Sequence, residues 1–180
     1  MKHLHKILVP TDLSEHSRCA LTYGCWLAAE ENAALVILHV ADEFTAWEYY
    51  SEDLAFSGLN GKPWPVDRVL EEASLDLSRF LEPSLFDLKK TATATKRVVL
   101  GSAAHQIVAV AENENADLII MSPHRHRGRW HWLHGSVTDR VTRMSPCPVL
   151  SITNPTTSHQ RRGKLVPIVS GWPSQRTVEA

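Results

Sequence analysis

One loop carries most of the residues that could do chemistry. An apolar run ends at Met121, and residues 122–134 then hold four histidines and three arginines before Gly135 and Ser136 open a helix. In open α/β sheets, ligands bind beyond the carboxyl ends of the strands, in loops of this kind. The amides at a helix N-terminus point outward and attract anions. The pattern therefore predicts a site for an anionic ligand at this loop.

The same histidines suggest a second chemistry, because closely spaced imidazoles can hold zinc, copper or nickel. A metal site needs three or four converging ligands, and no cysteine or carboxylate stands in the loop to complete a set. The interleaved arginines would also repel a cation. We therefore expect a solvated basic loop without a metal site, and a histidine-rich metal-responsive module is an alternative. The imidazoles could also titrate near neutral pH and change the charge of the loop.

A search for an activated nucleophile predicts no catalytic residue. Ser14, Ser17 and Ser102 are explained more simply as helix caps. Asp12 could form an acid–base pair with a loop histidine, but no base or metal-ligand motif accompanies it. The sequence therefore favours binding over turnover, with weak nucleotide hydrolysis as the alternative.

Composition limits the function classes that remain. The chain has 180 residues, 43% of them hydrophobic, and a formal net charge of −1, which argues against a strongly basic nucleic-acid binder. No apolar run approaches the roughly 18 residues of a membrane span, and the short apolar run at the N-terminus does not resemble a secretory signal. Cys19, Cys25 and Cys147 form no Cys-x-x-Cys pair, so we expect buried thiols in a cytoplasmic protein.

The fold class follows from an alternation of short apolar runs with segments of helical spacing. The runs cover residues 6–9, 35–40, 96–100, 117–121 and 147–153. Strict alternation predicts a five-stranded parallel sheet with helices on both faces, a flavodoxin/Rossmann-like open sandwich. The ligand crevice should lie where the strand order reverses, between the first and fourth strands.

Two segments depart from this pattern. Residues 42–65 form a long, aromatic-rich excursion between a strand and a helix. Residues 154–180 are rich in Pro, Ser, Thr and Gln, with one apolar patch at residues 165–169. We therefore predict one domain over residues 1–153 and a C-terminal extension that is partly disordered or docked on the domain or dimer edge.

Three stretches together resemble the universal stress protein family. They are KILVPTDLSEHS at residues 6–17, VVLGSAAHQIVAVAENENADLIIMS at 98–122 and HGSVTDRVTRMSPCPVLSI at 134–152. Their order and spacing are similar to those of the family from Lys6 to Thr153, apart from the aromatic excursion. The resemblance implies the adenine nucleotide alpha hydrolase-like fold and a role in binding and signalling during stress.

ATP-binding members of that family share a loop of Gly, two residues, Gly, nine residues, then Gly-Ser or Gly-Thr. Here Ser122 and Arg125 stand at the first two glycine positions, and only Gly135-Ser136 remains. The resemblance implies ATP or another adenine nucleotide, with Mg²⁺, as the ligand. It implies a site at nine positions: Pro10, Asp12, Val40, Met121, Ser122, Arg125, Gly135, Ser136 and Val137.

The two missing glycines matter because glycine lets a backbone pass close to a phosphate or a ribose. Ser122 adds a small hydroxyl. Arg125 adds a long cation, which could obstruct the phosphate channel or pair bidentately with a phosphate. Three outcomes stay open: an adenine nucleotide, a smaller anion such as phosphate or sulfate, or no ligand at all in a dimeric interaction module.

The last apolar run also carries a prediction about partners. Its residues Pro148 to Thr153 should form an edge of the sheet. An apolar edge strand pairs readily unless it is covered. The family resemblance implies a homodimer through this strand, and the alternative is that the tail covers the edge within its own subunit.

Overall fold

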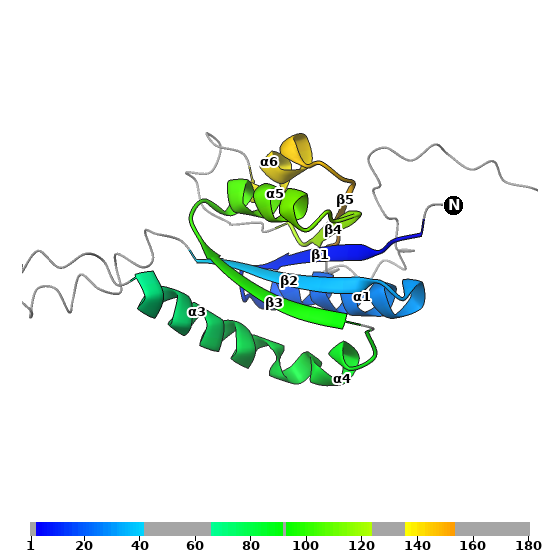
Figure 1. Cartoon of the computed structure of the whole chain (residues 1–180), viewed down its shortest axis with the longest axis horizontal. Helices are drawn as coiled ribbons and strands as arrows, with labels where there is room; N and C mark the ends of the chain where they lie inside the picture. Colours follow the sequence, from blue (N-terminus) through cyan, green and yellow to red (C-terminus); the bar gives the residue numbers. More distant parts are fainter. Residues whose placement is uncertain (1–2, 42–65, 92, 124–135, 154–180) are drawn as a thin grey trace, which may run out of the picture.

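The computed structural model describes residues 3–41, 66–91, 93–123 and 136–153 (Figure 1). The aromatic excursion, most of the histidine-rich loop and the C-terminal extension therefore lie outside the described residues. The predictions made for those segments stay predictions.

The described strands form one parallel sheet in the order β3-β2-β1-β4-β5. Their bounds are β1 Lys6–Thr11, β2 Ala34–Ala41, β3 Thr93–Leu100, β4 Leu118–Met121 and β5 Val149–Ser151. The order reverses between β1 and β4, which confirms the predicted fold class and puts the topological switch point between the two strands where the ligand crevice is predicted.

Helices cover both faces of the sheet (Figure 1). On one face lie α1 (Glu15–Glu31), α3 (Val66–Leu81), the 3-10 turn η1 (Glu82–Ser84) and α4 (Leu85–Leu88). On the other face lie α5 (Ala103–Asn113) and α6 (Val137–Met144). Each strand of a parallel sheet points alternate side chains to opposite faces, so two separate cores form.

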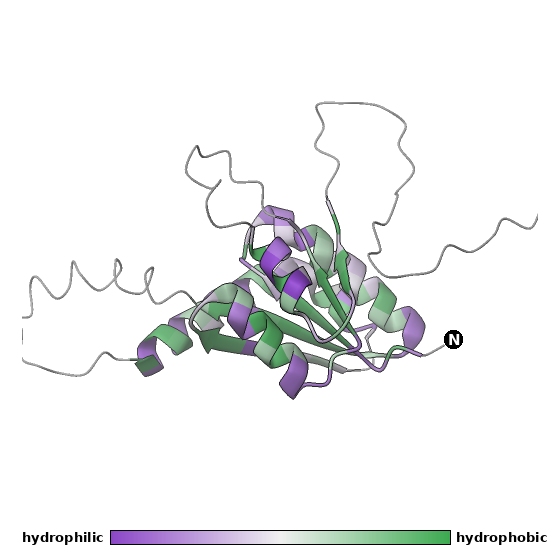
Figure 2. Ribbon diagram, turned by 90° about the horizontal axis from the view of Figure 1, so that it is seen from above, coloured by the Kyte–Doolittle hydropathy of each residue, from purple (hydrophilic) through white to green (hydrophobic). Residues whose placement is uncertain are grey.

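The first core joins the sheet to α1 and α3, and the second joins it to α5 and α6. Ile7 and Val9 of β1 point into the first, whereas Leu8 points into the second. The hydropathy view shows the same layering, with hydrophobic strands inside and hydrophilic stretches on the helices (Figure 2). Continuous apolar runs are typical of strands that are covered on both faces, which is why the runs predicted this sheet.

Several predicted boundaries are wrong by a few residues. β1 continues through Thr11, β3 starts at Thr93 and not at residue 96, and β5 starts at Val149 and not at residue 147. The first residues of β3 are polar and exposed, so their strand pairing with β2 left no apolar signal. Pro148 has no N–H, which delays the start of β5.

Candidate functional site

The candidate site begins where the pairing between β1 and β4 ends. The carbonyl of Lys6 accepts from the amide of Asp117 at 2.8 Å, so the backbone of every second residue from Lys6 onward faces β4. Pro10 is one of these residues and has no N–H to donate. The last β1–β4 pair is Leu8 with Ile119. Pro10 therefore cannot extend the pairing, and the β1–β4 pairing ends at the topological switch point, where the crevice is predicted.

The turn after β1 is held by its own side chains. Asp12 Oδ1 accepts from the amide and the hydroxyl of Ser14, at 3.1 and 2.6 Å. The buried Thr11 hydroxyl accepts from the amide of Leu13 at 3.0 Å. It lies 2.8 Å from the Ser17 hydroxyl, which itself donates to the Ser14 carbonyl. These bonds hold Asp12 in place just beyond the carboxyl end of β1.

This turn contains a backbone conformation that side chains rarely adopt. Leu13 has φ of 62°, in the left-handed region. The predicted N-cap at Ser14 is confirmed, because its hydroxyl accepts from the amide of Ser17 at 3.3 Å. Ser17 is not a cap, since its hydroxyl joins the buried network of the turn.

His39 belongs to this arrangement, although the sequence analysis did not single it out. Its Nδ1 lies 3.0 Å from the carbonyl oxygen of Thr11. A carbonyl can only accept, so Nδ1 carries the proton and the tautomer is set. His39 faces Thr11 across the β1–β2 pairing. The signal that could have revealed it is a polar residue near the carboxyl end of an otherwise apolar strand.

The next residue, Val40, points to the opposite face of the sheet and packs against the core beneath α5 and α6. Met121 is 5% exposed and belongs to the same core. These two side chains supply apolar surface at the carboxyl ends of β2 and β4. Ser122 follows Met121, and its hydroxyl oxygen is buried without a hydrogen-bond partner among the described residues.

The N-terminus of α6 is less open to anions than the sequence implied. Ser136 is the N-cap and forms a capping box with Asp139. The Ser136 hydroxyl accepts from the Asp139 amide at 3.1 Å, and the Asp139 carboxylate accepts from the Ser136 amide at 3.3 Å. The carboxylate also places a negative charge where an anion would sit. Of the four amides that a helix start leaves without intrahelical acceptors, those of Val137 and Thr138 remain.

Seven of the nine predicted site positions fall within the described residues. Pro10 and Met121 are buried, Val40, Ser122 and Ser136 are half-buried, and Asp12 and Val137 are exposed. Arg125, Gly135 and the loop histidines lie outside the described residues. Ser102 occupies the N-cap of α5 as predicted, but its side chain makes no capping hydrogen bond.

The cysteines show no sign of activation. Cys25 is 1% exposed, and burial raises the pKa of its thiol to about 11, with the charge of Asp87 adding to the effect. Burial also raises the pKa of the half-buried Cys147. A thiolate is the reactive form of cysteine, so these two side chains are poor nucleophiles. The prediction of buried thiols holds for Cys25, whereas Cys19 and Cys147 are partly exposed.

The described part of the chain offers no group of three or more His, Cys, Asp or Glu side chains that could hold a metal ion. Within the same residues, no helix has the length and apolar character needed to cross a membrane.

Comparison with known families identifies the family to which this chain belongs. The model of the universal stress protein family matches residues 3–152. The chain belongs to the universal stress protein family. It is 30% identical to universal stress protein MJ0577 of Methanocaldococcus jannaschii, over 82% of this chain and 93% of that protein. It is 28% identical to universal stress protein YxiE of Bacillus subtilis, over 82% of this chain and 98% of the relative.

Solved structures agree with this membership. The structure of MJ0577 superposes with a TM-score of 0.62 at 26% identity, covering 85% of this chain and 98% of that one. A universal stress protein in complex with cAMP gives a TM-score of 0.56 at 23% identity, covering 84% of this chain and 98% of the other. At that identity the second likeness supports the fold alone.

Proposed function

We propose that this universal stress protein binds ATP or another adenine nucleotide in the crevice between β1 and β4, and that it acts by binding and signalling and not by turnover. The observation that carries the proposal is the end of the β1–β4 pairing before Pro10, at the switch point, with Asp12 held just beyond the end of β1. Membership of a family that includes ATP-binding proteins supports a nucleotide as the ligand.

The described residues suit the parts of a nucleotide. The apolar surfaces of Val40 and Met121 suit one face of an adenine ring. The carboxylate of Asp12 can accept from an amino group or a ribose hydroxyl. The amides of Val137 and Thr138 suit a phosphate. Mg²⁺ would enter with the phosphates of ATP, because this ion is usually held by substrate phosphates together with one or two carboxylates.

Arg125 takes the place of a glycine, and its side chain determines whether the site accepts the phosphates of a nucleotide. We propose that it pairs with a phosphate, because a guanidinium binds phosphate oxygens bidentately. This pairing would offset the negative charge that Asp139 places at the start of α6. A guanidinium that instead obstructed the phosphates would leave the protein without a nucleotide.

Calorimetric titration with ATP, AMP and adenosine, each with and without Mg²⁺, tests the function. We expect saturable binding by the wild type and loss of phosphate-dependent affinity in Arg125→Ala. Arg143→Ala, an exposed change in the last turn of α6, is the matched control and should bind as the wild type does. Binding that appears only in Arg125→Ala would show that the arginine blocks the site. No binding in either would favour a ligand-free interaction module.

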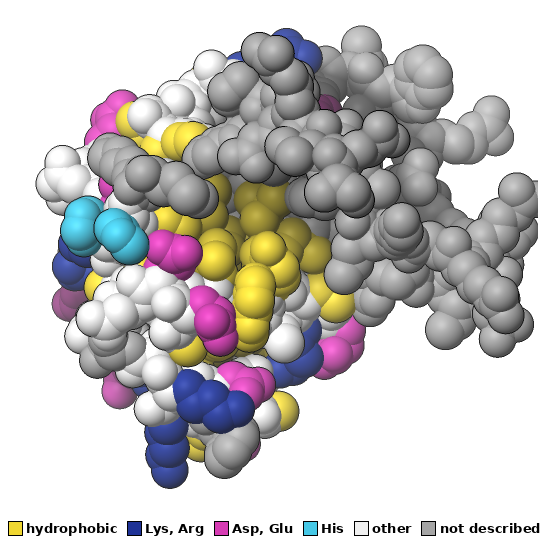
Figure 3. Space-filling model, turned by 90° about the vertical axis from the view of Figure 1, so that its right-hand side faces the viewer, with side chains coloured by type: hydrophobic (Ala, Val, Ile, Leu, Met, Phe, Trp, Pro, Cys, Tyr) yellow, Lys and Arg dark blue, Asp and Glu magenta, His cyan; other side chains and the backbone are white. Residues whose placement is uncertain are grey.

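We also propose that two copies associate through β5. Within the described residues β5 pairs with β4 on one side, and its other edge has no partner strand. Leu150 and Ile152 are only partly buried against the first core. Figure 3, which shows the right-hand side of Figure 1, has hydrophobic side chains near the middle of that face with charged side chains around them.

A further inference from the structure

The hydroxyl of Ser122 stands out in the part of the chain that the structure describes. It is the one buried side-chain nitrogen or oxygen there that has no hydrogen-bond partner. Leaving a buried donor unpaired costs a protein stability, so such groups are rare and usually have a functional reason.

Other buried hydroxyls of this chain are paired, which makes the contrast informative. The hydroxyls of Thr11 and Ser17 bond to each other at 2.8 Å. The hydroxyl of Thr91 donates to the carbonyl of Leu88 at 2.7 Å. Nearby hydroxyls or carbonyls therefore pair these buried hydroxyls, whereas no described residue pairs that of Ser122.

The position of Ser122 explains why its hydroxyl has no hydrogen-bond partner among the described residues. The residue stands just beyond the carboxyl end of β4, and the carbonyl of Met121 is engaged by the amide of Ile152 at 2.9 Å. On the other side of β4, Pro10 ends the pairing with β1. Ser122 thus lies at the switch point where the nucleotide is proposed to bind.

We propose that the Ser122 hydroxyl donates a hydrogen bond to an oxygen of the bound nucleotide, on its ribose or its phosphates. This inference rests on the proposed nucleotide site. It gives Ser122 a role that a glycine at this position would lack, because glycine has no side-chain donor. The Ser122 hydroxyl has no partner among the described residues, and the ligand would supply one.

This arrangement has a consequence that a purely structural serine would not have. Ser122→Ala removes the unpaired donor, so it should raise the melting temperature of the free protein by about 2–8 °C. The same change removes a ligand contact, so it should weaken nucleotide binding by about five- to thirty-fold. Stability and affinity therefore move in opposite directions.

The experiment compares wild type, Ser122→Ala, Ser122→Gly and Thr91→Val by thermal unfolding without ligand and by calorimetry with ATP and AMP. Ser122→Gly, like Ser122→Ala, should bind more weakly than the wild type. Thr91→Val is the matched control, because its hydroxyl is paired and lies at the end of α4. It should lower the melting temperature and leave affinity unchanged.

Two results would overturn the inference alone. One is equal affinity of wild type and Ser122→Ala for both nucleotides. The other is a lower melting temperature of free Ser122→Ala, which would mean that the hydroxyl is already paired. A wild type that binds neither nucleotide would overturn the proposed function as well, so the two failures are distinguishable.

Discussion

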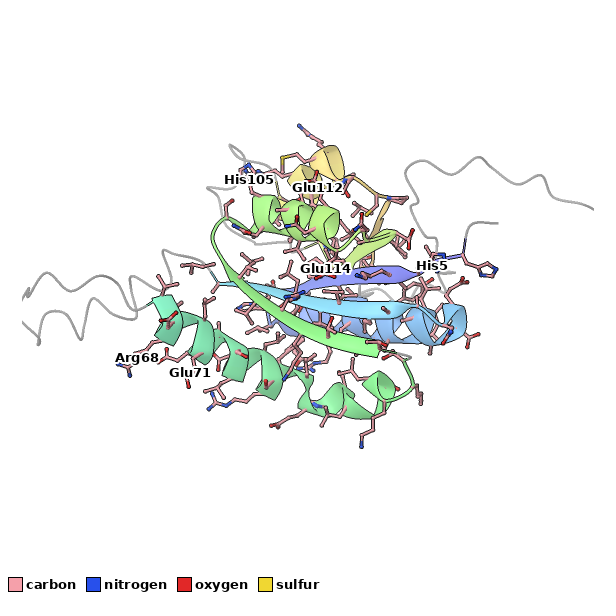
Figure 4. The ribbon with its side chains drawn as sticks, viewed as in Figure 1. His5, Arg68, Glu71, His105, Glu112 and Glu114 are labelled. Atoms are coloured by element: carbon pink, nitrogen blue, oxygen red, sulfur yellow. The ribbon has the colours of Figure 1, made fainter. Side chains whose placement is uncertain are left out.

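At the scale of single residues, one carboxylate at the end of a helix accepts hydrogen bonds from two strands. Glu114, at the end of α5, accepts from Lys6 Nζ of β1 at 2.9 Å and from Arg97 of β3 at 2.7 Å. Figure 4 labels Glu114 beside the sheet, just after the end of α5. Hydrogen bonding from Lys6 first, and then from Arg97, lowers the pKa of Glu114.

A lowered carboxyl pKa stabilises the folded state above the unfolded value of about 4.3. The contribution is lost as the pH falls through the folded value. We expect Glu114→Gln to cost about 1 kcal/mol at pH 7, a low figure because Arg97 is largely exposed. Urea unfolding at pH 7 and pH 3 should show the difference shrinking at the lower pH. Glu112→Gln, an exposed change on the same helix, should have little effect at either pH.

The cysteines allow a second test at this scale. With a pKa of about 11, Cys25 is almost entirely protonated at pH 8. We expect it to react with a disulfide reagent about a hundred-fold more slowly than an ordinary exposed thiol. Mapping the labelled peptides by mass spectrometry should find the half-buried Cys19 modified first. Equal labelling of both in the folded protein would contradict the burial of Cys25.

At the scale of elements, the close contact between α1 and β1 depends on a glycine, which has no side chain. A Cβ placed on Gly24 would lie 2.6 Å from Cγ2 of Val9, whose branched side chain has little freedom to move. Helical spacing alone predicted α1, and the close approach of helix to sheet at Gly24 became visible only in the fold.

Gly24→Ala should therefore destabilise the protein. Overpacking costs about 1–3 kcal/mol, and the better helix propensity of alanine returns about 1 kcal/mol. A net loss of up to about 2 kcal/mol in the free energy of unfolding should appear in urea titrations. Glu30→Ala, at an exposed position of α1, is the control and should change little. A gain in stability for Gly24→Ala would mean that α1 can move away from β1 at no cost.

At the scale of the whole molecule, the outer edge of β5 has no partner strand within the described residues, and a second copy or the extension at residues 154–180 are the two candidates to pair with it. Deleting that extension and measuring mass in solution separates the two. A dimer of the full chain that persists after deletion supports the proposed association through β5. A monomer that becomes a dimer or an aggregate on deletion would show that the extension covers the edge in its own subunit.

The sequence by itself determined the fold class and the family, because these follow from local periodicity and short motifs. The alternation of apolar runs with helical spacing predicted the sheet, and Pro10, Asp12 and Ser136 stood where the topology placed the crevice. Only the tertiary structure decided which polar atoms are paired. His39 meets a carbonyl 28 residues away, and Glu114 meets a lysine 108 residues away. Ser122 is left unpaired among the described residues. Hydrogen-bond partners so distant in sequence leave no periodic signal, because only the packed sheet brings them together.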